Sequence, residues 1–161
     1  MTAIRLFLIL AVVLLPVTAS AAVPWTGSPG SSVVDESSAG IYKLDNGQLS
    51  YNSSGSTSII VARLNVTDTT ATGYPGWTTM AIHAYDPGPS SQVRVTLIRV
   101  AAGTLTNIAT CASSDNAMIQ TSTCPILNSV DFNSGYIYEV VIEISRTSNT
   151  VSPFIGGIRL Y

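Results

Sequence analysis

The sequence predicts an all-β protein, a single antiparallel β-sandwich, jelly-roll-like, with about nine to ten strands. Three observations predict it: short runs of alternating apolar and polar residues recur, turn residues separate these runs, and no helical period persists. The run GYIYEVVIEISR, residues 135–146, shows the alternation well. Because successive strand side chains point to opposite faces, one face of each run is expected to be buried.

Residues 1–21 have the three parts of a secretory signal peptide. Arg5 supplies the positive charge, an apolar block covers residues 6–15, and small residues lead to Ala21 and Ala22. The block is too short for a transmembrane helix, which needs roughly 20 apolar residues. We therefore expect cleavage after Ala21 or Ala22, a secreted, periplasmic or extracellular location, and no transmembrane span in the mature chain.

After a turn-rich lead-in at residues 22–31, residues 32–161 are expected to form the sandwich domain. Its first strands are expected at 32–35, 40–45 and 48–52. The last two are joined through Asp45-Asn46-Gly47, whose residues tolerate the positive φ of a tight hairpin turn. These two strands are therefore expected to pair antiparallel.

The next strand, 58–67, shows how alternation assigns the faces. One side is wholly apolar and is expected to face the core: Ile60, Ala62, Leu64 and Val66. The opposite side is only half apolar: Ile59, Val61, Arg63 and Asn65. We expect a neighbouring segment to cover part of this second side.

Strands at 78–86, 92–100 and 104–111 are expected next. A short loop with a permissive glycine, Ala101-Ala102-Gly103, predicts that the last two form a hairpin. Cys111 and Cys124 are the only cysteines, and in an exported chain they are expected to form a disulfide, with two buried thiols as the alternative. Because serine and threonine dominate residues 112–122, we expect at most one short helical turn there.

The remaining strands are expected at 130–132, 135–146 and 153–161. In 135–146 the tyrosines and aliphatic residues at even positions are expected to face inward, which leaves Glu139 and Glu143 facing water. These two glutamates lie about 13 Å apart along a strand, whereas the two carboxylates of a glycosidase lie about 5 to 9.5 Å apart. We therefore interpret them as surface residues.

Charge and histidine content argue against several functions. Seven Lys and Arg are scattered against nine Asp and Glu, so no basic patch predicts nucleic-acid binding. His83 is the only histidine and no G-x-S-x-G motif accompanies it, so we expect an ordinary strand residue and no catalytic residues. One histidine and a disulfide leave too few zinc ligands. Asp35, Asp45 and Asp86 are interpreted as turn residues, and no metal or cofactor is expected.

The connection at 68–77 carries the best functional signal. It contains GYPGW, residues 73–77, and large aromatic rings in a loop can stack against the C–H face of a sugar. The candidate ligand-binding residues are Tyr74 and Trp77, together with Tyr85 or Trp25. The alternative is that Trp77 plugs the end of the sandwich.

Three segments, VRVTLIRV at 93–100 together with 135–146 and 153–161, resemble the C-terminal half of small secreted bacterial proteins with a jelly-roll-like sandwich. The resemblance rests on strand patterns and covers about half of the chain. It implies the fold and export, and it transfers no active-site residue.

These observations predict a non-catalytic binding or structural module whose ligand is a surface glycan or another cell-surface polymer. A second hypothesis is a self-assembling subunit of an extracellular matrix or appendage, a homo-oligomer formed through an edge strand. The last strand, 153–161, is the candidate edge. A secreted hydrolase ranks third.

Overall fold

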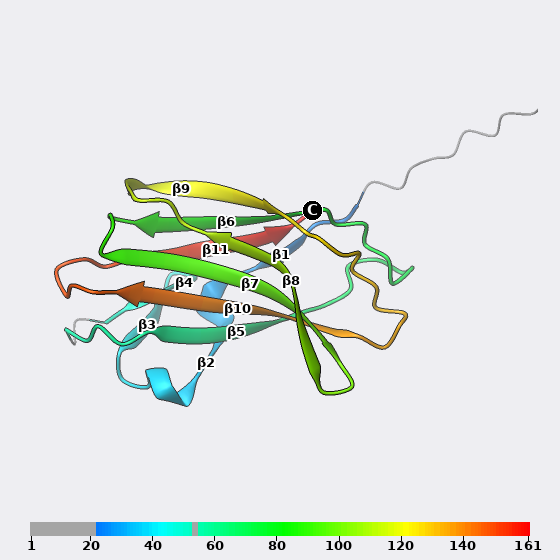
Figure 1. Ribbon diagram of the computed structural model, residues 1–161, viewed down its shortest axis with the longest axis horizontal. Helices are drawn as coiled ribbons and strands as arrows, with labels where there is room; N and C mark the ends of the chain where they lie inside the picture. Colours follow the sequence, from blue (N-terminus) through cyan, green and yellow to red (C-terminus); the bar gives the residue numbers. More distant parts are fainter. Residues whose placement is uncertain (1–21, 53–54) are drawn as a thin grey trace, which may run out of the picture.

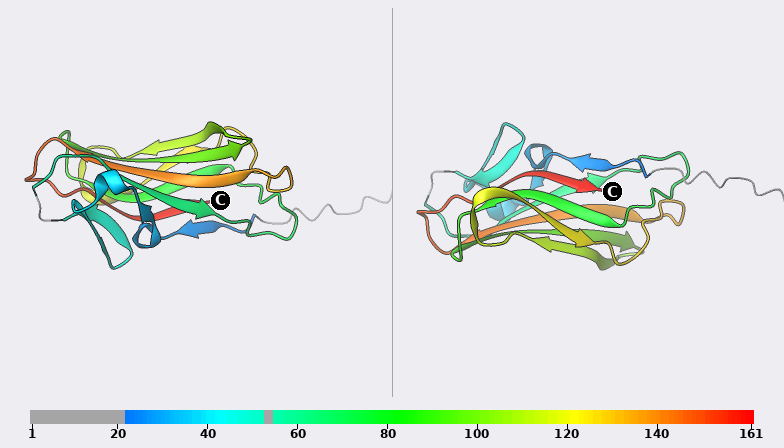
Figure 2. Two further views of the ribbon diagram at one scale, coloured as in Figure 1. Left: turned by 90° about the horizontal axis from the view of Figure 1, so that it is seen from below. Right: turned by 90° about the horizontal axis from the view of Figure 1, so that it is seen from above.

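The computed structural model describes residues 22–52 and 55–161, so the expected signal peptide lies outside the described residues. Two antiparallel sheets pack face to face, as both views in Figure 2 show. The expected β-sandwich is therefore confirmed. Within the described residues, no helix has the length and apolar character needed to cross a membrane.

Eleven strands are assigned in the described residues, and Figure 1 shows their arrangement. Sheet A has the order β3 (Tyr42–Asp45), β4 (Gln48–Tyr51), β11 (Phe154–Leu160), β6 (Thr79–Asp86) and β9 (Asn116–Pro125), and β1 (Trp25–Gly27) also pairs with β11. Sheet B has the order β2 (Val33–Val34), β5 (Ile60–Val66), β10 (Ile137–Arg146), β7 (Ser91–Ala101) and β8 (Thr104–Ala112). Two short 3-10 turns, η1 (Pro29–Ser31) and η2 (Glu36–Ser38), flank β2.

Alternation in the sequence sets the core. On β10, Tyr138, Val140, Ile142 and Ile144 are fully buried, while the glutamates between them face outward, as expected. The apolar side of β5 is also buried. Each fully buried aliphatic side chain contributes about 1.5–3 kcal/mol. The Tyr138 hydroxyl reaches a polar partner, because it accepts a hydrogen bond from the Asp131 N–H at 2.9 Å.

Both expected hairpins are present. The β3–β4 turn has Asn46 at φ 49° and Gly47 at φ 79°, and the β7–β8 turn has Ala102 at φ 46° and Gly103 at φ 81°. Positive φ at both central residues is the property of a type I′ turn, whose twist matches that of paired strands. Local turn chemistry therefore determines which strands pair at these two places.

The disulfide is confirmed. Cys111 on β8 is bonded to Cys124 on β9, with 5.5 Å between the Cα atoms. Because β8 is at one edge of sheet B and β9 is at one edge of sheet A, this bond joins the two sheets along one side of the sandwich.

Two strands lie in segments where the sequence predicts none. The segment 112–122, where at most a helical turn was expected, lies mostly in β9, so that expectation is wrong. Threonine suits strands, and an exposed edge strand needs little apolar alternation. Strand β1 lies within residues 22–31 and pairs with β11, so sheet A begins before residue 32.

The expected strand at 130–132 is not formed. Val130 is buried, but the Phe132 N–H donates to the Gly73 carbonyl at 2.8 Å, and the Asp131 carboxylate accepts from the Asn133 N–H at 2.8 Å. These local bonds hold the segment as a turn against the 68–77 loop. Strand β11 also departs from expectation: it lies between β4 and β6, so the last strand is not a sheet edge.

Candidate functional site

An aromatic pair lies on the outer face of sheet A. Tyr85 on β6 and Phe154 on β11 are direct cross-strand neighbours, and Ser50 on β4 lies beside Phe154. The two rings stack with their centroids 5.3 Å apart and their planes 27° apart. Both side chains are half-buried, so part of this aromatic surface stays open to solvent.

Two adjacent glycines, Gly156 and Gly157, continue β11 beyond the aromatic pair. Neither has a positive φ, so the backbone does not require glycine there. A Cβ added at Gly157 would lie 3.5 Å from His83 Cδ2, and one at Gly156 would lie 3.8 Å from Gln48 Cγ, which are ordinary contact distances. Packing therefore does not require glycine either. The missing side chains leave the floor of this face bare, which suits the close approach of a ligand.

The β3–β4 hairpin, in cyan, projects from sheet A (Figure 2). An open groove of about 580 Å³ lies against it, lined by Lys43, Asp45, Gln48, Ser50, Tyr51, Asn52, Ser152 and Phe154. Lys43 Nζ and Asp45 Oδ2 are 4.0 Å apart, so these two charges offset each other. The groove therefore offers amide and hydroxyl groups with little net charge.

His83 belongs to the same face, where it neighbours Gly157 on one side and Thr121 on the other. Its Nδ1 is 2.8 Å from the Thr121 Oγ1. The side chain is exposed, as an ordinary strand residue is expected to be. In a Ser-His-Asp triad a carboxylate orients the histidine ring, whereas the group beside His83 Nδ1 is the Thr121 hydroxyl.

Trp77 lies at the opposite end of the sandwich. It precedes β6 by two residues, and the six strand positions from Thr79 to Tyr85 alone span about 20 Å. Its indole is 3% exposed, donates from Nε1 to the Val23 carbonyl at 2.8 Å, and meets the Phe132 ring edge-on at 6.2 Å. Trp77 is therefore a buried residue that closes the end of the sandwich, and its ring is not an exposed surface for a sugar. The candidate residue Trp25 is also buried.

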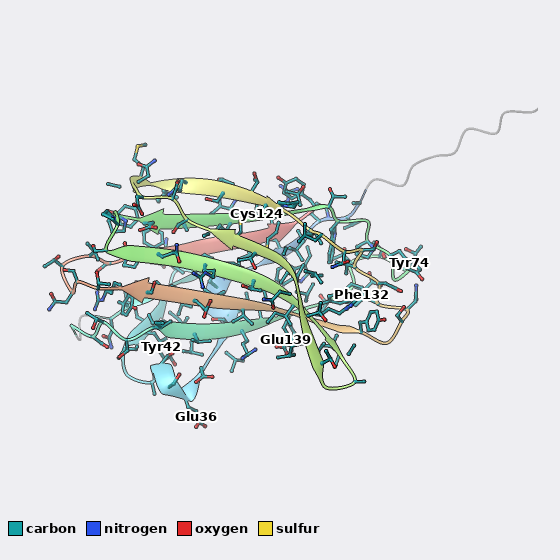
Figure 3. The ribbon with its side chains drawn as sticks, viewed as in Figure 1. Glu36, Tyr42, Tyr74, Cys124, Phe132 and Glu139 are labelled. Atoms are coloured by element: carbon teal, nitrogen blue, oxygen red, sulfur yellow. A yellow bond between two sulfur atoms is a disulfide. The ribbon has the colours of Figure 1, made fainter. Side chains whose placement is uncertain are left out.

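Tyr74 is 58% exposed and lies near Phe132, whereas Tyr42 on the hairpin lies toward the other end (Figure 3). Tyr74 interacts with Asp131. The pKa of Asp131 is held below its usual value mainly by a hydrogen bond from the Ser134 hydroxyl, and hydrogen bonds from backbone N–H groups and from Tyr74 act in the same direction. The structure therefore does not bring Tyr74, Trp77 and Tyr85 together. Tyr85 alone of the three lies on the outer face of sheet A.

The two glutamates of β10 each lie near an arginine on the outer face of sheet B. Glu139 Oε2 is 3.3 Å from Arg63 Nη1, and Glu143 Oε2 is 3.8 Å from Arg94 Nη1. Both pairs are partly exposed, and surface ion pairs contribute little to stability.

Replacing Glu143 with glutamine is therefore expected to change the free energy of unfolding by less than about 1 kcal/mol, because solvent screens the Arg94 pair. Urea unfolding of the variant and the wild-type protein measures this difference. A loss of several kcal/mol would contradict the interpretation of Glu143 as a surface residue.

Two of the aspartates interpreted as turn residues have hydrogen-bond partners within the protein. Asp35 accepts from the Ser37 N–H at 2.9 Å and caps η2, while the buried Asp86 accepts hydrogen bonds from the hydroxyls of Ser91 and Ser113. In the part of the chain that the structure describes, no three His, Cys, Asp or Glu residues are grouped so as to hold a metal ion.

The sequence analysis missed most of the residues on the outer face of sheet A. It identified Tyr85 but not Phe154, the glycine floor or the groove. The pair Gly156-Gly157 within an apolar strand was the available signal, because glycine inside a strand marks a bulge or a close approach of a ligand, and the pairing of β11 with β6 does shift register between Ile155 and Gly157.

No protein-family model and no curated protein matches the sequence. Among solved structures, the fold is similar to that of CsCBM6-3 from Clostridium stercorarium, solved in complex with cellobiose. The TM-score is 0.52 and the identity 9%, and the match covers 83% of this chain and 90% of that chain. At this identity the likeness shows the fold alone, a jelly-roll-like β-sandwich.

Two further solved structures have TM-scores below 0.5. One is a family 11 carbohydrate-binding module from Clostridium thermocellum in complex with a β-1,3-1,4-mixed-linked tetrasaccharide, with a TM-score of 0.46, 10% identity, and coverage of 85% of this chain and 86% of that chain. The other is a glycoside hydrolase family 43 arabinoxylan arabinofuranohydrolase from Bacillus subtilis, with a TM-score of 0.47, 10% identity, and coverage of 80% of this chain but 24% of that chain.

Proposed function

We propose that the protein is a secreted, non-catalytic carbohydrate-binding module whose ligand lies on the outer face of sheet A. The observation that carries the proposal is the stacked Tyr85–Phe154 pair, placed between the groove and the bare floor at Gly156 and Gly157.

The chemistry of this face suits a neutral sugar. The apolar C–H face of a pyranose ring packs on an aromatic ring, and the exposed part of the Tyr85–Phe154 pair supplies such a surface. Sugar hydroxyls need both donors and acceptors, which Gln48 and Ser50 provide in the groove. Because Lys43 and Asp45 offset each other, the groove has no excess charge to favour an acidic glycan.

What supports a non-catalytic role is the placement of the acidic side chains. Glu139 and Glu143 lie on the other sheet, each near an arginine, and Asp45 in the groove lies near Lys43. Glycoside hydrolysis needs two carboxylates facing each other across the scissile bond. The groove lining contains one carboxylate, Asp45.

The test is calorimetric titration of the processed protein with a panel of soluble neutral oligosaccharides that includes cellobiose, the ligand bound by the structural neighbour. Two variants change the site in opposite ways: Tyr85→Ala removes the aromatic surface, and Gly157→Val fills the floor. Each is expected to weaken binding by about tenfold or more, which corresponds to about 1.4 kcal/mol.

Tyr74→Ala is the matched control, since it removes an exposed tyrosine at the opposite end and is expected to leave binding unchanged. Circular dichroism checks that each variant is folded. Binding that survives both site variants but is lost in Tyr74→Ala would place the ligand in the 68–77 loop instead. A protein that binds no member of a broad glycan panel would refute the proposal.

A further inference from the structure

Strand β9 forms a long, uncharged edge of sheet A. It pairs with β6 along one side, and the described residues place no strand on its other side (Figure 1). The strand has ten residues, NAMIQTSTCP, and none of them is charged. Its pairing with β6 is regular from Pro125 to Ile119, and a register shift follows in which Ala117 and Met118 of β9 are extra residues. A strand of this kind is a template for pairing with another strand.

The other edges in the described part of the chain are each protected. Strands β1 and β2 have three and two residues, and β3 has four, of which Lys43 and Asp45 are charged. Strand β8 is longer, but its pairing with β7 contains a bulge at Leu97/Ile98, and the Leu127 N–H donates to the Ile108 carbonyl at 2.8 Å. Shortness, charge, bulges and covering segments are the usual means by which proteins block edge pairing. Strand β9 is uncharged, its bulge is confined to Ala117 and Met118, and its disulfide to β8 lies at Cys124, so the stretch from Ile119 to Thr123 has none of these protections.

We propose that β9 pairs antiparallel with β9 of a second copy of this chain, so that two copies of sheet A become one continuous sheet. An uncharged strand meets itself without like-charge repulsion, and a net charge of −2 per chain opposes association only weakly. Ile119 lies in the regular part of this strand and is 66% exposed, and pairing reduces the apolar surface that it presents to water. A different partner with a charged strand would find no opposite charge on β9, so a second copy of the same uncharged strand fits better.

The geometry of this pairing has a consequence for the rest of sheet A. Two identical strands that pair antiparallel are related by a two-fold axis perpendicular to the sheet. Such an axis leaves the faces of the sheet unexchanged, so the outer faces of both copies point the same way. A polymer carrying a repeated ligand can then reach both copies at once, which raises the effective affinity.

The test is the mass of the processed protein by light scattering, measured from about 10 µM to about 1 mM because interfaces of this small size are weak. The wild-type mass is expected to double across this range. Met118→Lys/Thr123→Lys adds two cations per copy at exposed positions of β9 and is expected to keep the protein monomeric. Thr104→Lys/Thr110→Lys adds the same charge at exposed positions of β8 and is expected to dimerise like the wild type.

Hydrogen exchange of the wild-type protein gives a second readout that needs no variant. The amides of β9 are expected to exchange more slowly at high concentration, while those of β8 are unchanged. A wild-type protein that remains monomeric at about 1 mM would overturn the proposal, and so would a β9 variant that dimerises like the β8 variant. If the β9 variant does not fold, the concentration dependence of β9 exchange decides. None of these readouts depends on a glycan, so the outcome is independent of the proposed function.

Discussion

Replacement of Trp77 by alanine is expected to destabilise the protein by about 3–5 kcal/mol, the usual cost of truncating a large buried aromatic side chain. The indole is 3% exposed and packs edge-on against Phe132. Its loss leaves a cavity at the end of the sandwich and removes one of two hydrogen bonds to the Val23 carbonyl, to which the Thr69 hydroxyl also donates. Urea unfolding measures the change, and Trp77→Phe is expected to cost less because a ring refills much of the space.

Tyr74→Ala is the control for this prediction, because Tyr74 lies three residues away in the same loop but is 58% exposed. It is expected to cost no more than about 1 kcal/mol. Equal losses from the two alanine variants would show that the indole is not a core residue. The Trp77→Ala protein, where it is folded, is also expected to retain glycan binding, since the proposed site lies at the other end of the sandwich.

The strands that the sequence predicts well are those whose alternation is strong. From Ile60 to Val66 in β5 and from Tyr138 to Ile144 in β10 every second side chain is apolar and buried, and burial of that face leaves one register only. Strand β9 has too weak a pattern to be recognised, because an edge strand exposed along most of its length needs little apolar surface. Its position is determined by pairing with β6 and by the disulfide to β8, which are contacts between distant segments.

The candidate site was less predictable for a related reason. Trp77 and Tyr85 are near each other in the sequence, but a strand joins them and places them at opposite ends of the sandwich. Phe154 is far from Tyr85 in the sequence yet stacks on it, because β11 lies beside β6. Strand order in a sheet is not set by local pattern, and a site that crosses several strands depends on that order.

Loss of the Cys111–Cys124 disulfide is expected to lower the free energy of unfolding by about 3 kcal/mol. The cysteines are 13 residues apart, and the estimate follows from the conformational freedom that the unfolded chain gains when a loop of this length opens. The comparison is between the oxidised protein and Cys111→Ala/Cys124→Ala, because Cys111 is fully buried and alanine introduces no polar atom.

The denaturant slope distinguishes this cause from damage to the native structure. If the bond acts by restricting the unfolded chain, its removal exposes more surface on unfolding, so the m-value is expected to rise while the native circular dichroism stays the same. Because the bond joins β8 to β9, native-state hydrogen exchange is expected to quicken first in β9, which otherwise pairs only with β6. An unchanged unfolding midpoint, or a loss accompanied by altered native spectra and an unchanged m-value, would contradict a stabilisation that operates through the unfolded state.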